Sequence, residues 1–303
     1  MTHPQLITQY AKNESCTIQQ ALAWAGSFLR NKGLPDPRLS AELLLGSVIG
    51  LERPGLILHR DRSLDKKEGV VFKEKVLRRA EHEPVAYLVG QKEFWSLTFE
   101  VNPQVLIPRP ETELLVEQTL GILSNRTGPI TLVELGTGSG AVSIALSKSL
   151  THPLTTRLIA TDISRGALRT AQKNAGLHGM EKTIHFVQGD WLRPFSSRSR
   201  WIDLMVSNPP YVSEKELLQL PTTVRKFEPL KALSGGQDGL EAIRLIFRQV
   251  VKQLKRGGWL ILEIGESQGS QVLNLARKYH FNPITVLRDH AGKDRVLKAC
   301  YHG

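Results

Sequence analysis

Four consecutive residues, Asn208 to Tyr211, form the stretch of the sequence best suited to a chemical reaction. They follow the apolar run IDLMVS, which predicts that Asn208 stands where a buried strand ends. Pro209 and Pro210 stiffen the loop and have no backbone donor. A planar nitrogen is a poor nucleophile, but the Asn208 side-chain oxygen and the Pro209 carbonyl could hold both hydrogens of its NH₂ group. Tyr211 offers that group a flat face. The loop therefore favours methyl transfer to an amide or exocyclic amine over a proline-rich turn without chemistry.

A second candidate is the glycine-rich turn in VELGTGSGAVSIAL, between a predicted strand and a predicted helix. Gly136, Gly138 and Gly140 let the backbone turn sharply and approach a ligand without a Cβ in the way. Asp162 lies at the end of the next predicted strand, where a carboxylate can bind ribose hydroxyls. An adenosine-type cofactor is therefore expected. Gly136, Gly138 and Ala141 also fit a loose dinucleotide fingerprint, so this turn alone leaves a nicotinamide cofactor open. The loop at Asn208 favours a methyl donor instead.

Strands and helices that could position both loops alternate from residue 130 onward. Strands are predicted at ITLVEL, RLIATDI, IHFVQG, IDLMVSN and WLILEIG, and helices at AVSIALSKSL, SRGALRTAQKNAGL and GLEAIRLIFRQVVKQLKRG. The tail ITVLRDHAGKDRVLKACYH is predicted to form two strands that meet around DHAGKD. This alternation is typical of βαβ units and a mostly parallel sheet. Both candidate loops would lie at its carboxyl edge, where open α/β folds bind ligands.

The first part of the chain carries helix signals and no catalytic constellation. Residues 1–84 are predicted to form a small helical bundle. Thr17 and Gln20 stand in capping-box positions, and Asp36 and Pro37 are spaced as an N-cap and a first-turn proline. A third helix is predicted over KKEGVVFKEKVLRRAEHE. We therefore expect a domain for packing or partner binding.

Residues 85–107 have a different character. AYLVG and FWSLTFEV lie on either side of QKE, and their β-branched and aromatic residues predict a hairpin. A helix is predicted after Pro110, with Glu111 and Glu113 in its first turn. The expected organisation is thus a helical domain, a hairpin linker and a third region over residues 108–303.

Composition limits the possible classes of protein. Hydrophobic residues make up 41% of the chain, enough for a substantial core. No apolar run is long enough to span a membrane, and residues 1–16 lack the apolar region of a signal peptide, so a cytoplasmic protein is expected. Cys16 and Cys300 form no metal-type cluster, and no metal is expected. The net charge of +11 favours an anionic partner such as RNA or DNA, but scattered surface lysine and arginine explain it equally well.

Several segments together resemble a known family. NPPY after GTGSG is similar to the class I S-adenosylmethionine-dependent methyltransferases that methylate amide or exocyclic nitrogens. LIPRPETELLVE, PVAYLVGQKEFWSLTFEVNP, EPLKALSGGQDGLEAIRLI, GGWLILEIGESQG and DHAGKDRV resemble the peptide chain release factor glutamine methyltransferases, the HemK/PrmC family. The resemblance covers residues 84–298. It implies an α/β fold with a Rossmann-like, mostly parallel sheet, a small N-terminal α-helical domain for substrate docking and a β-hairpin linker.

The resemblance also implies roles for single residues. S-adenosylmethionine would be the cofactor, with Asp162 on its ribose and Trp191 against its adenine region. The expected cofactor-binding residues are Gly136, Thr137, Gly138, Ser139, Gly140, Asp162, Trp191 and Asn208. The residues expected to hold the substrate glutamine are Asn208, Pro209, Pro210 and Tyr211. Arg109 and Glu111 could shape the cofactor mouth or cap a helix, and the sequence leaves both open.

The resemblance implies an enzyme that methylates N5 of the glutamine in the Gly-Gly-Gln motif of class 1 release factors. A monomer without a direct nucleic-acid substrate is expected. An adenine-N6 nucleic-acid methyltransferase shares NPPY, but no target-recognition segment is evident. A ribosomal-protein glutamine methyltransferase is a second alternative. The segment IPRPETE argues against it, because that relative carries a different sequence after its proline-arginine. A non-catalytic binding protein would carry a degraded cofactor loop. The chain has its own Gly235-Gly236-Gln237, but Asp238 and Glu241 have capping-box spacing, so we interpret it as a turn and N-cap.

Overall fold

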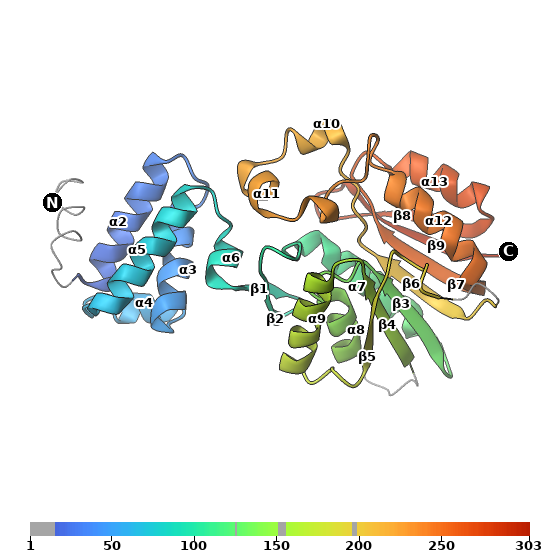
Figure 1. The fold of residues 1–303 in the computed structure, drawn as a ribbon, viewed down its shortest axis with the longest axis horizontal. Helices are drawn as coiled ribbons and strands as arrows, with labels where there is room; N and C mark the ends of the chain where they lie inside the picture. The colour runs from blue at the N-terminus through green and yellow to red at the C-terminus, as the bar shows by residue number, and fades with distance from the viewer. Residues whose placement is uncertain (1–15, 125, 151–155, 196–198) are drawn as a thin grey trace. The chain divides into compact units, whose positions relative to one another are not determined.

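The computed structural model describes residues 16–124, 126–150, 156–195 and 199–303. The predictions that concern residues 1–15 fall outside this part of the chain. The chain forms two compact units (Figure 1), one of Met1–Gly90 with Thr222–Phe227 and one of Gln91–Pro221 with Glu228–Gly303. Each unit has its own core, so each is described by itself.

The first unit is helical, as predicted. Its core is apolar and gathers Trp24, Leu44 and Phe72 from three different helices. Thr17 and Gln20 form the predicted capping box at the start of the first described helix. The helices are α2 (Ile18–Asn31), α3 (Pro37–Ile49), α4 (Arg53–Leu58), α5 (Lys66–Ala80), α6 (Val85–Val89) and α11 (Thr222–Phe227).

One local prediction for this unit is confirmed, with Asp36 as the N-cap and Pro37 as the first residue of α3, and another is wrong. Asp36 holds the N-cap position of α3 but has a left-handed backbone, φ 47°, and its side chain makes no capping hydrogen bond. AYLVG, residues 86–90, was predicted as the first hairpin strand, but it lies in helix α6 (Val85–Val89) and at its C-cap. Pro84 precedes this helix, and Gly90 ends it with φ 84°. These boundary signals outweigh the β-branched composition of so short a segment.

The second unit is built on a seven-stranded sheet in the order β5-β4-β3-β6-β7-β9-β8. β9 runs opposite to the other six strands of this sheet, so the predicted mostly parallel sheet is confirmed. The predicted strands all form, and the tail pairs as two strands around DHAGKD. The strands are β3 (Ile130–Leu135), β4 (Thr156–Asp162), β5 (Ile184–Gln188), β6 (Ile202–Ser207), β7 (Leu254–Glu263), β8 (Phe281–Arg288) and β9 (Asp294–Tyr301).

Helices cover both faces of this sheet, giving three layers (Figure 1). Successive strand residues alternate between the two cores: Leu132 and Leu204 face one side, Val133 and Met205 the other. One face packs against α7 (Glu113–Leu123), α8 (Ala141–Ser149) and α9 (Arg165–Leu177), and the other against α12 (Glu241–Gln253) and α13 (Gly269–Lys278). Burial on both faces explains the continuous apolar runs of the central strands.

The hairpin of this unit lies later in the chain than predicted. Its strands are β1 (Gln91–Phe94) and β2 (Leu97–Glu100), with Trp95 and Ser96 at the turn. Both turn residues have positive φ, 54° and 55°, a conformation usually given to Asn or Gly. Residue preferences therefore do not predict this tight turn. The sequence prediction placed the connection at QKE, which belongs to β1.

The Gly-Gly-Gln segment is confirmed as a turn, but the predicted N-cap is wrong. Helix α12 begins at Glu241, and Leu240 occupies its N-cap without a side-chain bond. The Asp238 carboxylate instead accepts from the Leu240 N–H and pairs with Arg244. Gln237 donates its backbone N–H to the Glu241 carboxylate. These contacts give the segment a structural role.

Candidate active site

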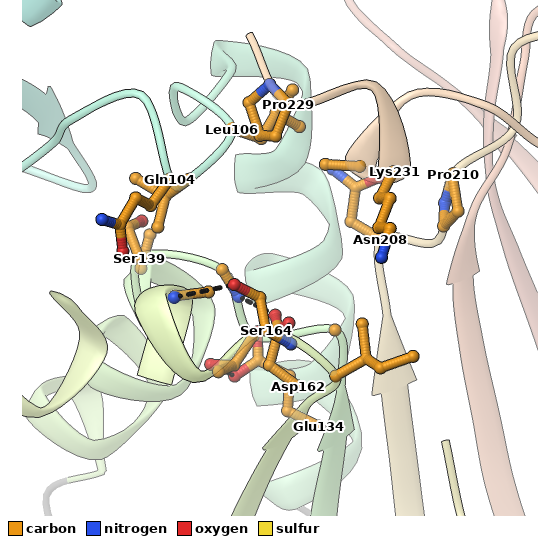
Figure 2. A pocket seen from close by; sticks show the side chains of 18 of the residues that line it. Gln104, Leu106, Glu134, Ser139, Asp162, Ser164, Asn208, Pro210, Pro229 and Lys231 are labelled. Carbon is orange, nitrogen blue, oxygen red and sulfur yellow. Dashed lines mark hydrogen bonds between the residues drawn. The ribbon is translucent and has the colours of Figure 1, made fainter. Parts of the chain in front are cut away.

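A cavity of about 630 Å³ lies at the carboxyl ends of the central strands. Both loops singled out from the sequence reach it, because β3 leads into the glycine turn, β4 ends at Asp162 and β6 leads into Asn208. Figure 2 shows Glu134 and Asp162 on one side of the cavity, and Asn208 with Pro210 on another. The fold thus brings together residues that are far apart in the sequence.

The glycine turn is shaped by close approach. Gly136 has φ 72°, and a Cβ at this position would lie 3.7 Å from the Trp191 ring. Gly140 has φ 83°, and its Cβ would meet Ala171 and Ile144 at 3.1 Å. Gly136 thus keeps the wall next to Trp191 open, whereas Gly140 lets α8 pack closely against α9.

A buried carboxyl group in β3 is hydrogen-bonded to the glycine turn and to the helix that follows it. Glu134, in β3, accepts hydrogen bonds from the hydroxyls of Thr137, at 2.7 Å, and Ser143. Burial raises the pKa of Glu134 to about 7, although both hydroxyl bonds oppose the rise. The turn is further fixed by the Thr137 N–H, which donates to the Thr161 carbonyl, and by the Asn174 amide, which donates to the Ser139 carbonyl.

Asp162 lies where the sequence predicts it, at the end of β4. Its carboxylate accepts from the backbone N–H of Gly138 at 2.9 Å and of Ser164 at 2.8 Å. Burial raises the pKa of Asp162, and these backbone bonds oppose that rise. A carboxylate has about four lone-pair sites, so it can still accept from ribose hydroxyls.

The Asn208 loop is anchored from two neighbouring elements. The Asn208 Nδ2 group donates to the Thr112 hydroxyl at 3.1 Å, and Thr112 donates to Glu263 at 2.7 Å. The Tyr211 hydroxyl donates to the other Glu263 oxygen at 3.1 Å. Burial, followed by the nearby Glu263 charge, raises the pKa of Tyr211, so its hydroxyl keeps the proton that it donates.

An ion pair links two segments at the cavity. Arg109 pairs with Glu228, whose side chain is 1% exposed and also accepts from the Ile107 N–H at 3.2 Å. Arg109 makes no side-chain cap at the following 3-10 helix, Pro110–Thr112. Figure 2 shows Leu106 beside Pro229, one residue from each linked segment. Of the two roles left open for Arg109, the structure favours shaping the cavity.

The predicted site residues divide into those that line the cavity and those that do not. The predicted residues in its lining are Arg109, Gly136, Thr137, Gly138, Ser139, Asp162, Trp191, Asn208 and Pro210. The other candidates do not belong to the described lining of the cavity: Glu111, Gly140, Pro209 and Tyr211. Gly140 serves helix packing, and Tyr211 packs beside the core with its hydroxyl on Glu263.

Sequence reasoning missed Glu134, Thr112, Glu228 and Glu263. Two of them carried a signal: Glu134 and Glu263 are acidic residues inside otherwise apolar strand runs, ITLVEL and WLILE. A charge in a buried strand needs partners, which marks it as a candidate site residue. Thr112 and Glu228 carried no such signal, and their partners lie between 96 and 151 residues away along the chain.

The three-layer sheet and the cavity at its carboxyl edge define a class I methyltransferase. The family models agree: residues 20–90 match the PrmC N-terminal domain and residues 111–225 the methyltransferase small domain. The structure is also similar to the hMettl16 catalytic domain solved with a 3′UTR hairpin, with a TM-score of 0.54 and 15% identity over 80% of this chain and 86% of that one. This likeness shows the fold alone.

Curated relatives identify the family. The release factor glutamine methyltransferase of Moorella thermoacetica is 42% identical over 93% of this chain and 98% of its own length. Those of Geobacter sulfurreducens and Bacillus subtilis are each 38% identical over 94% of this chain, and over 97% and 98% of their own lengths. The chain therefore belongs to the release factor glutamine methyltransferase family, as the sequence motifs predicted.

The cofactor of this enzyme class, S-adenosylmethionine, fits the residues present. The cavity has an acceptor at Asp162, an aromatic wall at Trp191 and a glycine turn whose open side a Cβ at Gly136 would fill. In the described part of the chain, no cluster of His, Cys, Asp or Glu could hold a metal ion. None of the helices described there combines the length and apolarity needed to cross a lipid bilayer.

Proposed function

We propose that this protein transfers a methyl group from S-adenosylmethionine to N5 of the glutamine in the Gly-Gly-Gln motif of class 1 release factors, and so modulates translation termination. The observation that carries the proposal is the bond from Asn208 Nδ2 to Thr112. It commits the NH₂ end of Asn208 to the protein and leaves the carbonyl end free to accept, in a residue that lines the cavity. Membership of the family supports the choice of substrate.

The chain's part in the reaction is positioning. S-adenosylmethionine, when bound, supplies an electrophilic methyl group. Asp162, the glycine turn and Trp191 would hold the cofactor. The Asn208 oxygen and the Pro209 carbonyl would accept the two N–H groups of the substrate amide, which orients its nitrogen and favours the positive charge that develops on it. Pro210 would keep the loop rigid, and Tyr211 would support the planar amide.

The helical unit would dock the release factor. It matches the PrmC N-terminal domain over residues 20–90. Its described surface exposes apolar side chains that a partner could cover, among them Ile57, Leu58 and Val70 at 66%, 80% and 59%. We propose a cytoplasmic monomer that acts on protein and has no direct nucleic-acid substrate.

A parallel labelling experiment tests this function. The protein would be incubated with methyl-labelled S-adenosylmethionine and, separately, with purified release factor, ribosomal proteins and DNA. Label is expected in the release factor alone. Label in the ribosomal proteins or in DNA would favour one of the alternatives left by the sequence.

A further inference from the structure

Glu263 is a buried carboxylate that the proposed reaction has not yet used. It ends β7, and the register that pairs Ser207 with Leu262 places it beside Asn208 at the sheet edge. Glu263 is only 1% exposed. A buried charge is costly unless partners compensate it, and here the partners are the hydroxyls of Thr112 and Tyr211. Tyr211 is the last residue of the Asn208 loop, and Thr112 accepts a hydrogen bond from Asn208.

These bonds have a fixed direction. The Thr112 hydroxyl donates its hydrogen to Glu263, the direction that the bond must have whenever this carboxyl group is ionised. The Thr112 oxygen then offers only lone pairs to Asn208, which must present its NH₂ group there. The carbonyl end of the Asn208 amide is thereby kept as an acceptor. Reversing this amide would place two acceptors against each other and put a donor where the substrate NH₂ needs an acceptor.

The second oxygen of Glu263 fixes the far end of the loop. It accepts from the Tyr211 hydroxyl at 3.1 Å. The backbone carbonyl of Tyr211 also accepts from the Gln268 amide at 3.0 Å. Both ends of Asn208–Pro209–Pro210–Tyr211 are therefore bonded to this part of the sheet edge, with one carboxylate common to both.

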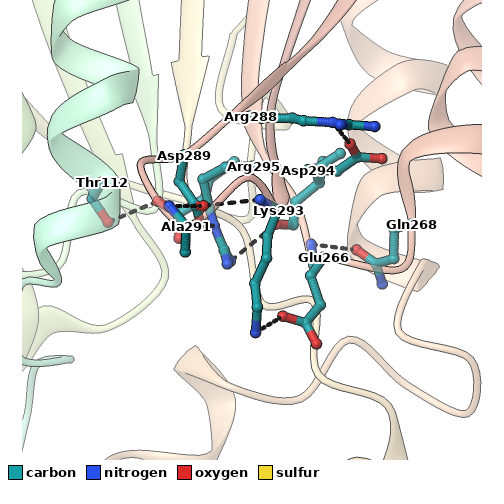
Figure 3. A network of polar contacts seen from close by, with 12 residues as sticks. Thr112, Glu266, Gln268, Arg288, Asp289, Ala291, Lys293, Asp294 and Arg295 are labelled. Atoms are coloured by element: carbon teal, nitrogen blue, oxygen red, sulfur yellow. Dashed lines mark hydrogen bonds and ion pairs between the residues drawn. The ribbon is translucent and has the colours of Figure 1, made fainter.

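The tail hairpin supplies a counter-charge. Arg295 lies close enough to Glu263 for its charge to oppose the rise that burial causes in the pKa of Glu263. The Arg295 guanidinium donates to Asp289 at 3.1 Å. Asp289 also accepts from the backbone N–H groups of Ala291 and Lys293 (Figure 3). The DHAGKD segment thus holds Arg295 near the carboxyl group, where its charge partly offsets the rise in the pKa of Glu263 that burial causes.

We propose that Glu263 is a positioning residue for the acceptor site: acting through Thr112 and Tyr211, it fixes the Asn208 amide with its carbonyl available to the substrate. This inference rests on the proposed function, because it assigns to Asn208 the task of accepting from the substrate amide. Thr112 connects Glu263 to Asn208, because its hydroxyl donates to Glu263 and accepts from the Asn208 amide. Of Glu263, Thr112 and Asn208, only Asn208 is expected to touch the substrate.

The test compares substitutions that change hydrogen bonding but not size. Thr112→Val keeps the shape and removes the acceptor for Asn208, so kcat on release factor should fall at least about tenfold. Kd for S-adenosylmethionine and KM for release factor should stay within about twofold. Thr112→Ser restores the hydroxyl and should recover most of the lost kcat. Glu263→Gln, the second variant, adds a donor where two acceptors are needed and should lower kcat in the same way.

Thr119→Val is the matched control. Thr119 is, like Thr112, a buried threonine, and its hydroxyl donates to the Leu115 carbonyl at 2.7 Å inside α7. It should lose stability without losing kcat. Wild-type kcat in both Thr112→Val and Glu263→Gln, or an equal fall in Thr119→Val, would overturn the positioning role while leaving the proposed function intact. Failure of the wild-type protein to methylate release factor would overturn both.

Discussion

The backbone N–H of Gly138 donates to Oδ2 of Asp162 across 2.9 Å. This bond ties the middle of the glycine turn to the carboxylate at the end of the neighbouring strand. The two parts of the proposed cofactor site are therefore set relative to each other before any ligand enters. Pre-organisation of this kind reduces the ordering that binding must impose.

Replacing Asp162 should weaken cofactor binding. Asp162→Ala removes a charged acceptor for ribose hydroxyls as well as the bond to Gly138. Hydrogen bonds to charged groups contribute roughly 1.5–3 kcal/mol, so Kd for S-adenosylmethionine should rise about tenfold or more. Isothermal titration calorimetry measures this directly. Asp61→Ala, which removes an exposed carboxylate from the other unit, is the control, and an Asp162→Ala affinity equal to that control would remove the ribose assignment.

Replacing Asn208 should act on the chemical step. Asn208→Ala leaves the glycine turn and Asp162 in place but removes the acceptor for the substrate amide. Turnover should nearly vanish, with Kd for S-adenosylmethionine within a few-fold of wild type. Single-turnover kinetics at saturating release factor check this. Activity comparable to wild type under those conditions would show that Asn208 does not orient the acceptor.

The sequence predicted the central sheet and the two loops that meet at the cavity, because both depend on local signals. Apolar runs marked β3, β4 and β6, and glycines with a strand-end aspartate marked the cofactor side. The hairpin was misplaced because Trp95 and Ser96 adopt positive φ without the usual turn residues. Local composition cannot reveal a turn that tertiary packing imposes.

The supporting contacts of the site were beyond sequence reasoning for a different reason. Thr112 and Glu263 are separated by 151 residues, and Arg109 and Glu228 by 119. Each pair forms only once the sheet order is set. The sequence could mark Glu134 and Glu263 as unusual. The hydroxyl partners of Glu134 lie only 3 and 9 residues away, whereas the fold brings the partners of Glu263 from 151 and 52 residues away.

The buried Glu134 should make stability depend on pH. Its folded pKa is about 7 and the ordinary value is 4.5, so the folded state holds the proton more tightly. Stability from this group is fully present below pH 4.5 and is lost as the pH rises through 7. Relative to Glu134→Gln, which stays neutral, wild type should lose roughly 2–3 kcal/mol between pH 5 and pH 8. Urea unfolding of both proteins measures the difference, and parallel pH profiles would contradict it.

Removing residues 1–90, which make up the helical unit apart from Thr222–Phe227, should separate docking from chemistry. A protein lacking residues 1–90 should bind S-adenosylmethionine with nearly unchanged Kd, because the lining residues of the cavity all belong to the other unit. Methylation of whole release factor should fall by far more than methylation of a short Gly-Gly-Gln peptide. Calorimetry first establishes that the shortened protein binds the cofactor. Normal kcat/KM on whole release factor would then exclude a docking role.

The most direct test of the central claim is mass spectrometry of the release factor after reaction with the protein and S-adenosylmethionine. The account predicts a single added methyl group, located by fragmentation on the side-chain amide of the glutamine in the Gly-Gly-Gln motif. The flanking glycines let that exposed loop approach the site without side-chain clash. A release factor with this glutamine replaced by alanine should gain no methyl group. Methylation that persists in this variant, or that falls on another residue, would contradict the account.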